Sequence, residues 1–182
     1  MFSPPDLPHL PDSPCYLNGE IGPLREARIS VLDRGFIFGD GIYEVVPVYG
    51  GRPFRLEQHL ARLSRSLAEI RIDNPHDAAG WRALIDRLVL ANATHQGKAP
   101  HEIDQFVYLQ ISRGVAPRDH AMLAGLTPTV FAMVQPLKPV PTALRISGVA
   151  CVSADDFRWE KAHIKSTSLL GAVLSRQISA DV

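Results

Sequence analysis

Lys165 is the residue of this chain whose type is best suited to covalent chemistry. It stands in the segment 164–174, IKSTSLLGAVL, where apolar residues on both sides favour partial burial of its amine. A lysine becomes a nucleophile or forms a Schiff base only if its pKa is lowered, which burial or a neighbouring cation can do. A lysine just ahead of a helix is more often exposed, however. The residue types alone therefore leave a catalytic and a surface lysine both open.

Two arginines and one histidine are candidates for binding anions. Arg62 falls on the polar side of a predicted helix, and its planar guanidinium can donate to two phosphate oxygens at once. Arg118 and His120 stand two apart in the loop 113–120, so in an extended backbone both side chains project in the same direction. Such a pair suits a carboxylate, although exposed arginines and solvated loops of the same composition are common.

A glycine-broken loop leads into an apolar strand at residues 33–46, DRGFIFGDGIYEVV. Its three glycines within seven residues indicate a backbone that bends sharply or approaches another group closely. In the strand that follows, Tyr43 and Val45 lie on one face and Glu44 and Val46 on the other, since successive side chains alternate. By itself the segment is typical of a loop that enters a buried strand.

Short strands would position these residues. The pattern predicts strands at 15–17, 28–32, 43–49, 52–55, 106–112, 129–134 and 144–152, with turns at Asn18-Gly19 and Gly50-Gly51. The strands at 106–112 and 129–134 are apolar enough to be buried on both faces. Pro47 cannot donate to a ladder, so its strand must have a free edge or a bulge there.

Three helices complete the predicted elements. One apolar stripe is formed by Leu56, Leu60, Leu63, Leu67 and Ile70, at spacings of four and three residues. A second helix is indicated by Trp81, Leu84, Ile85, Leu88 and Val89, and it ends before Gly97. A third is expected from about residue 168 to 178. Strands and helices in this order predict an α+β fold.

Proline-rich stretches divide the chain. Five of the 15 prolines fall in the first 14 residues, which favours an extended arm at 1–15. A small N-terminal α/β domain is predicted at 16–136. Three prolines within the six residues 136–141 indicate an interdomain linker at 137–141. The opening of a second domain is predicted at 142–182.

Composition excludes several classes of function. With 19 basic and 19 acidic residues and no basic cluster interleaved with aromatics, a nucleic-acid surface is not expected. No apolar run is long enough for a membrane span, and the first residues do not resemble a secretory signal. The seven histidines and the two cysteines, Cys15 and Cys151, show no metal-ligand spacing. We therefore expect no metal, no disulfide and a cytoplasmic protein.

Four segments, in this order, resemble the fold-type IV family of pyridoxal-phosphate enzymes. They are GDGIYE at 39–44, HLARL at 59–63, RGVAPRDH at 113–120 and IKS at 164–166. The family holds the D-amino acid aminotransferases, the branched-chain aminotransferases and aminodeoxychorismate lyase. The resemblance covers residues 16–182 and is closest to the D-amino acid branch. It implies that residues 142–182 open a larger, β-rich cofactor domain.

The resemblance implies a role for each candidate residue. Lys165 would hold pyridoxal 5′-phosphate as an aldimine and move the proton at the substrate Cα, and Arg62 would bind the cofactor phosphate. Tyr43, Arg118 and His120 would bind the substrate α-carboxylate, with Arg118 and His120 reaching across the interface of a homodimer. The implied reaction is a ping-pong transamination between a D-amino acid of the D-alanine class and a 2-oxo acid.

The resemblance also has a departure and leaves alternatives open. Family members continue for a stretch that supplies the glutamate paired to the pyridine nitrogen and most of the phosphate-binding groups. We therefore expect the chain to be a fragment or a truncated product that is inactive by itself. Aminodeoxychorismate lyase and branched-chain aminotransferase are alternatives with the same cofactor, but Arg118 with His120 argues against both. An alternative of another class is a non-catalytic dimerisation unit without cofactor.

Overall fold

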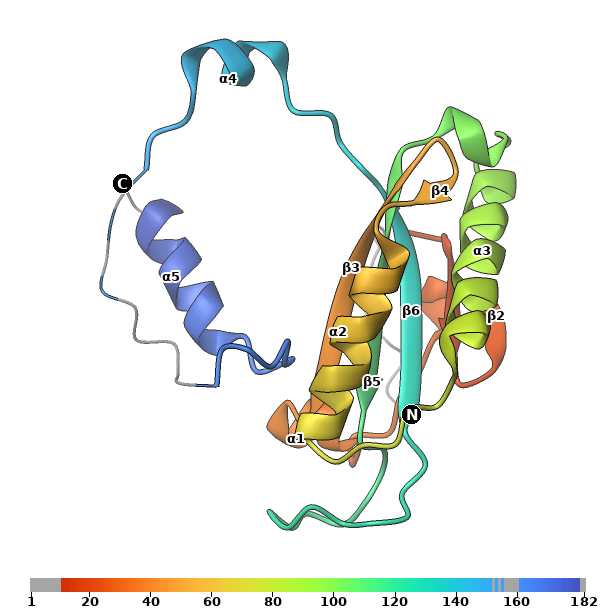
Figure 1. The fold of residues 1–182 in the computed structure, drawn as a ribbon, viewed down its shortest axis with the longest axis vertical. Coiled ribbons are helices and arrows are strands. Elements are labelled where there is room, and N and C mark those ends of the chain that lie inside the picture. The colour runs from red at the N-terminus through yellow and green to blue at the C-terminus, as the bar shows by residue number, and fades with distance from the viewer. Residues whose placement is uncertain (1–10, 152, 154, 156–160, 181–182) are drawn as a thin grey trace, which may run out of the picture.

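The structure of the chain is a computed structural model that describes residues 11–151, 153, 155 and 161–180. Its centre is one six-stranded antiparallel sheet with the strand order β2-β1-β6-β5-β3-β4 (Figure 1). The strands span Pro14–Leu17 (β1), Glu20–Pro23 (β2), Gly41–Tyr49 (β3), Arg52–Pro53 (β4), Gln105–Ser112 (β5) and Thr129–Pro136 (β6). The helices span Arg34–Phe38 (α1), Leu56–Glu69 (α2), Ala78–His95 (α3), Thr142–Ser147 (α4) and Leu170–Ala180 (α5), with short 3-10 turns at Leu24–Glu26 (η1) and Pro100–Glu102 (η2). The predicted α+β class is confirmed.

Helices α2 and α3 cover one face of the sheet and form the core with it (Figure 1). The side chains of both predicted stripes that lie within these helices are buried: Leu56, Leu60, Leu63 and Leu67 on α2, and Trp81, Leu84, Ile85, Leu88 and Val89 on α3. Full burial of a large apolar side chain contributes roughly 1.5–3 kcal/mol, so these stripes fix both helices on the sheet. Helix α3 begins where the Asp77 carboxylate accepts from the Gly80 backbone N–H at 2.7 Å, and Gly97 follows its end with a φ of +66°.

The second face of the sheet is only half-buried. Along β5 and β6 the burial alternates, so that Val107 and Leu109 are buried against the helices while Phe106 and Tyr108 are half-buried on the opposite face. On β6, Phe131 lies on this second face as well. The prediction that these strands are buried on both faces is wrong, because α2 and α3 both pack on the same side.

Strand β3 has an edge that is largely free, as Pro47 requires. Its partner β4 spans only Arg52–Pro53 and pairs with Val48 and Tyr49. The Pro47 carbonyl accepts from the Phe54 N–H at 2.8 Å, on the β4 side. In an antiparallel strand the nitrogen of a residue faces the same side as its carbonyl. The nitrogen of Pro47 therefore faces away from β5, and its missing N–H removes no hydrogen bond between β3 and β5. The expected strand at 52–55 is shorter than predicted.

The glycine loop contains one turn of helix, α1. Asp33 caps its start by accepting from the Gly35 N–H at 2.8 Å, and Gly39 ends it with a φ of +64°. The hairpin between β1 and β2 turns at Asn18 and Gly19, both with positive φ, as the Asn-Gly signal predicts.

Two predicted strands, at 28–32 and 144–152, do not form within the described residues, and residue 152 lies outside them. Residues 28–32 are all exposed and have no ladder, and residues 142–147 form helix α4 instead of the start of the strand predicted at 144–152. A strand needs a neighbour to pair its backbone groups, and no strand lies beside either segment within the described residues. A helix satisfies these groups internally, which explains α4. The helix predicted near 168–178 is confirmed as α5.

The division into arm, small domain, linker and second domain stays a prediction, and residues 1–10 of the arm lie outside the described residues. Strand β1 already begins at Pro14. None of the helices in the described part is long and apolar enough to cross a membrane.

Candidate active site

Lys165 lies at the free edge of β3. The Tyr43 N–H donates to the Lys165 carbonyl at 2.9 Å, and the Thr167 N–H donates to the Gly41 carbonyl at 3.0 Å. Segment 164–167 thus continues the sheet at the edge that the short β4 leaves open. The Lys165 Nζ lies 3.8 Å from the centroid of the Tyr43 ring, a cation–π contact. The predicted lysine and tyrosine therefore meet.

Tyr43 is supported from the second face of the sheet. Its ring stacks on Tyr108 of β5 with centroids 5.7 Å apart, and the Tyr108 hydroxyl donates to Gln110 Oε1 at 2.7 Å. Burial, together with the neighbouring Tyr43, raises the pKa of Tyr108, so its hydroxyl stays protonated at neutral pH. Tyr108, as a neutral side chain, thus supports the Tyr43 ring next to Lys165.

Arg62 lies on the other side of β3, paired with Glu44. Its Nε donates to Glu44 Oε1 and its Nη2 to Glu44 Oε2, both at 2.6 Å, and His59 Nδ1 lies 2.7 Å from Oε2. The hydrogen bond with Glu44 raises the pKa of the Arg62 guanidinium further above its usual range. Sequence reasoning missed this partnership, although a glutamate on the core-facing side of a strand signals that a cation must meet it.

Tyr43, Arg62 and Lys165 line one cavity of about 380 Å³. Its other lining residues are Ala162, His163, Ile164, Ser166, Ser168, Leu169, Gly171 and Ala172. This volume is within the range of small-ligand pockets, and no carboxylate is among the described residues that line it. An amine that can bond an aldehyde carbon, with a guanidinium and hydroxyls that can donate to a phosphate, fits pyridoxal phosphate by its donor set.

Arg118 and His120 do not line this cavity. Both are exposed, in the loop between β5 and β6, and both contact the ring of Phe38 at the end of α1. The Arg118 guanidinium carbon lies 5.4 Å and the His120 ring 5.3 Å from the Phe38 centroid. The chain therefore brings these two residues together with each other, but not with Lys165.

A buried cluster around Asp40 fixes this loop. Asp40 Oδ2 accepts from Arg34 Nε at 2.7 Å and from Arg113 Nε at 2.8 Å, and both arginine side chains are 3% exposed. Although burial alone would raise it, hydrogen bonds from Arg113 and Arg34 hold the pKa of Asp40 below its usual range. Arg34 Nη1 also donates to the Asp119 carbonyl at 2.5 Å. Apart from the charges of its members, no local sequence pattern predicts this cluster.

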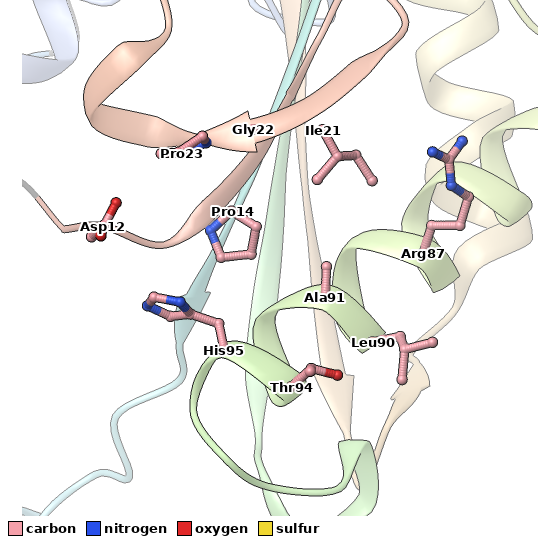
Figure 2. Close-up of a pocket in the computed structure, with 10 residues that line it drawn as sticks. All are labelled: Asp12, Pro14, Ile21, Gly22, Pro23, Arg87, Leu90, Ala91, Thr94 and His95. Atoms are coloured by element: carbon pink, nitrogen blue, oxygen red, sulfur yellow. The ribbon is translucent and has the colours of Figure 1, made fainter.

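A larger hollow, of about 690 Å³, lies between the β1–β2 hairpin and α3 (Figure 2). Its lining is mostly apolar, including Ile21 and Leu90, and the side chains of Arg87 and His95 stand at opposite ends of it. None of the predicted site residues lines this hollow. Size alone therefore does not mark the site.

The profile of a protein family described as Amino-transferase class IV matches residues 41–181. The chain belongs to this family. A D-alanine aminotransferase from Bacillus licheniformis is 40% identical over 160 residues, which make up 88% of this chain and 53% of that protein. The chain spans about half the length of the curated relatives it matches.

Solved structures have the same fold as this class IV aminotransferase chain. A branched-chain aminotransferase from Thermoproteus uzoniensis with norvaline matches with a TM-score of 0.73 and 22% identity, over 91% of this chain and 55% of that one. A 4-amino-4-deoxychorismate lyase from Pseudomonas aeruginosa matches with a TM-score of 0.65 and 28% identity, over 90% and 56%. The predicted family and fold are confirmed, and with them pyridoxal phosphate as the cofactor of the family.

Proposed function

We propose that the protein transfers an amino group between a D-amino acid of the D-alanine class and a 2-oxo acid, with pyridoxal phosphate as cofactor. The observation that carries the proposal is the convergence of Lys165, Tyr43 and Arg62 on one cavity. A relative named as a D-alanine aminotransferase is 40% identical to the chain, which supports the D-amino acid class.

Lys165 and Arg62 are the residues that would hold the cofactor. The amine of Lys165 would bond its aldehyde carbon, and the guanidinium of Arg62 would donate to its phosphate. When bound, pyridoxal phosphate supplies a ring that accepts the electron pair left at the substrate Cα. In the cofactor-free protein, the cation–π contact with Tyr43 holds the lysine amine at the wall of the cavity.

Lys165 would also carry the proton. Once its amine is free of the cofactor carbon, it removes the proton from the substrate Cα as general base and delivers it as general acid. The keto acid then leaves, and a second 2-oxo acid such as 2-oxoglutarate takes the amino group in the reverse half of the reaction. A single mobile amine beside the reacting carbon suits both steps.

Arg118 and His120 would bind the substrate α-carboxylate together with Tyr43, from the partner subunit of a homodimer. Their position supports this, because both are exposed and outside the cavity of their own chain. Large apolar side chains around the same loop are exposed as well: Leu32, Phe36, Val115 and Met122. Apolar surface of this kind marks an interaction site.

We further infer that the enzyme works in the cytoplasm. Cys15 and Cys151 are both free thiols, and burial raises the pKa of Cys15. Free thiols are typical of proteins in a reducing compartment.

The test is a Lys165→Ala variant of the intact protein. We expect turnover of D-alanine and 2-oxoglutarate to fall by at least about 10²–10⁴-fold, since the variant loses the proton carrier as well as the covalent anchor. Lys161→Ala is the matched control, because Lys161 is exposed and outside the cavity lining. Pyruvate formation measured by a coupled assay is the readout.

Assays with two further substrates distinguish the proposed reaction from the lyase and branched-chain aminotransferase reactions. Pyruvate released from aminodeoxychorismate without an amino acceptor would assign the lyase reaction instead. Turnover of an L-branched-chain donor alone would assign the branched-chain reaction. Normal turnover in the Lys165→Ala variant would contradict the assignment of the lysine.

A further inference from the structure

We propose that Glu44 is a positioning residue for phosphate binding, which it controls by holding one edge of the Arg62 guanidinium. The inference rests on the proposed function, because it concerns the phosphate of the proposed cofactor. It assigns a role to a residue that does not line the cavity and touches no proposed substrate group.

The Glu44 carboxylate is fully buried. Its side chain is 1% exposed, on the face of β3 that is directed at α2. A carboxylate removed from water must be paired and hydrogen-bonded, or its desolvation is very costly. Helix α2 meets this requirement with His59 and Arg62, which lie one turn apart and both contact Glu44.

Arg62 reaches Glu44 with Nε and Nη2 at once, both at 2.6 Å, which is the bidentate arrangement that best fixes a guanidinium plane. His59 Nδ1 lies 3.4 Å from Nη2, but at 2.7 Å from Glu44 Oε2 it donates to the carboxylate and does not accept from Arg62. Within the described residues no hydrogen-bond partner occupies Nη1. Glu44 therefore decides which donors Arg62 has left for a ligand.

The pair with Glu44 orders the Arg62 side chain before a ligand binds. The Arg62 side chain is 42% exposed, so without Glu44 its flexible stem would populate several rotamers. Fixing a side chain before the ligand arrives removes that ordering cost from binding. Glu44 also keeps the Arg62 charge partly compensated, so orientation rather than charge alone is what the pair supplies to a phosphate.

The experiment measures affinity for pyridoxal 5′-phosphate and for pyridoxal in a Glu44→Gln variant of the intact protein. Only the first ligand carries a phosphate, so the ratio of the two dissociation constants isolates the phosphate contact. We expect pyridoxal phosphate to bind about tenfold more weakly, with pyridoxal affinity unchanged. The stabilisation of the cofactor-free protein by inorganic phosphate, read as a shift in Tm, should shrink in parallel.

Glu57→Gln is the matched control. Glu57 lies on α2, the helix that carries Arg62, and pairs with Arg82 at 2.5 Å. That pair is exposed and outside the cavity. The ratio of dissociation constants and the phosphate-dependent Tm shift should not change in this variant. If Glu44 acts through Arg62, the effects of Glu44→Gln and Arg62→Lys on the ratio should not add in the double variant.

The outcomes are distinguishable. If the parent protein transaminates D-alanine but Glu44→Gln has the parental ratio of the two dissociation constants, this inference is overturned and the proposed function stands. A parent protein that binds neither pyridoxal phosphate nor inorganic phosphate would overturn both. If Glu44→Gln does not fold, Glu44→Asp carries the same test, because it keeps the charge but shortens the reach to Arg62.

Discussion

Two carboxylates shielded from water, Asp40 at 13% exposure and Glu44 at 1%, lie on either side of Tyr43 in the sequence. Asp40 pairs with Arg34 and Arg113 at the base of the 113–120 loop, and Glu44 pairs with α2. Each of them ties a segment that carries proposed site residues to β3. Because a buried ion pair loses most when one partner is removed, these acids are where substitutions should be most costly.

We expect Asp40→Asn to lower the free energy of unfolding by about 3 kcal/mol at pH 7, because two buried guanidinium groups then lose their counter-charge. The folded-state pKa of Asp40 lies below its unfolded value. Its stabilisation is therefore complete above the unfolded pKa of about 3.9 and is lost as the pH falls through the folded pKa. The difference in free energy of unfolding between the parent protein and Asp40→Asn should therefore become smaller as the pH falls.

Urea unfolding of both proteins at pH 7, 5 and 3 measures this gap. Asp12→Asn provides the control, since Asp12 contacts Arg25 at 3.4 Å with both side chains about half exposed. A control variant as destabilised as Asp40→Asn, or a gap that widens towards pH 3, would contradict the role assigned to the cluster.

At this scale the sequence predicted the types of the cavity residues but not their neighbours. Lys165 and Tyr43 could be singled out from their local segments, and alternation placed Glu44 on the face opposite Tyr43. The partners of Glu44 come from a helix that packs on the sheet. Those of Asp40 come from α1 and from the residue that follows β5. Contacts that depend on tertiary packing leave no local period to detect.

At the scale of elements, the short β4 is the feature that makes the site. Because β4 pairs with only the last residues of β3, the first residues of β3 have an open edge. The lysine segment occupies that edge through Tyr43 and Gly41. The strands predicted at 28–32 and 144–152 failed for the opposite reason: their residues suit strands, but no partner lies beside them among the described residues.

Gly41 should be intolerant of a side chain. A Cβ there would lie 2.6 Å from the Ile111 carbonyl oxygen and 3.0 Å from the Ser112 Cα, both on backbone of β5. We expect Gly41→Ala to cost about 1–3 kcal/mol of unfolding free energy. It should also weaken cofactor binding, because the Gly41 carbonyl accepts from Thr167 beside the lysine.

Gly22→Ala is the matched control, since Gly22 also lies in a strand but an added Cβ would meet nothing within 4 Å. Urea unfolding and titration with pyridoxal phosphate measure both variants. Equal free energies of unfolding in the two variants would mean that β3 and β5 can separate enough to admit a methyl group. Equal affinities for pyridoxal phosphate would mean that Gly41 does not hold the lysine segment in place.

At the scale of the whole molecule, the proposed site is divided between two surfaces. Lys165, Tyr43 and Arg62 share a cavity, whereas Arg118 and His120 lie on an exposed loop held by Arg34 and Phe38. Under the proposed function, a single chain in this arrangement would bind cofactor and carboxylate at different places. A second copy that presents its loop to the cavity would unite them, so the proposed reaction would require the proposed dimer.

Mixing two defective variants tests this requirement. Arg118→Ala alone should lose a factor of about tens to thousands in kcat/KM, as expected when one partner of a buried charged contact is removed. Subunit exchange between Arg118→Ala and Lys165→Ala in equal amounts should restore about one quarter of the parental activity, because half of the dimers are mixed and each has one intact site.

The control mixture is Arg62→Ala with Lys165→Ala. Arg62 and Lys165 line the same cavity of one chain, so every site in a mixed dimer keeps one defect and no activity should return. Activity is measured as pyruvate formed from D-alanine, before and after exchange. If the Arg118→Ala mixture stays as inactive as this control although exchange has occurred, the carboxylate pair acts within its own chain, and the loop must move towards Lys165 instead.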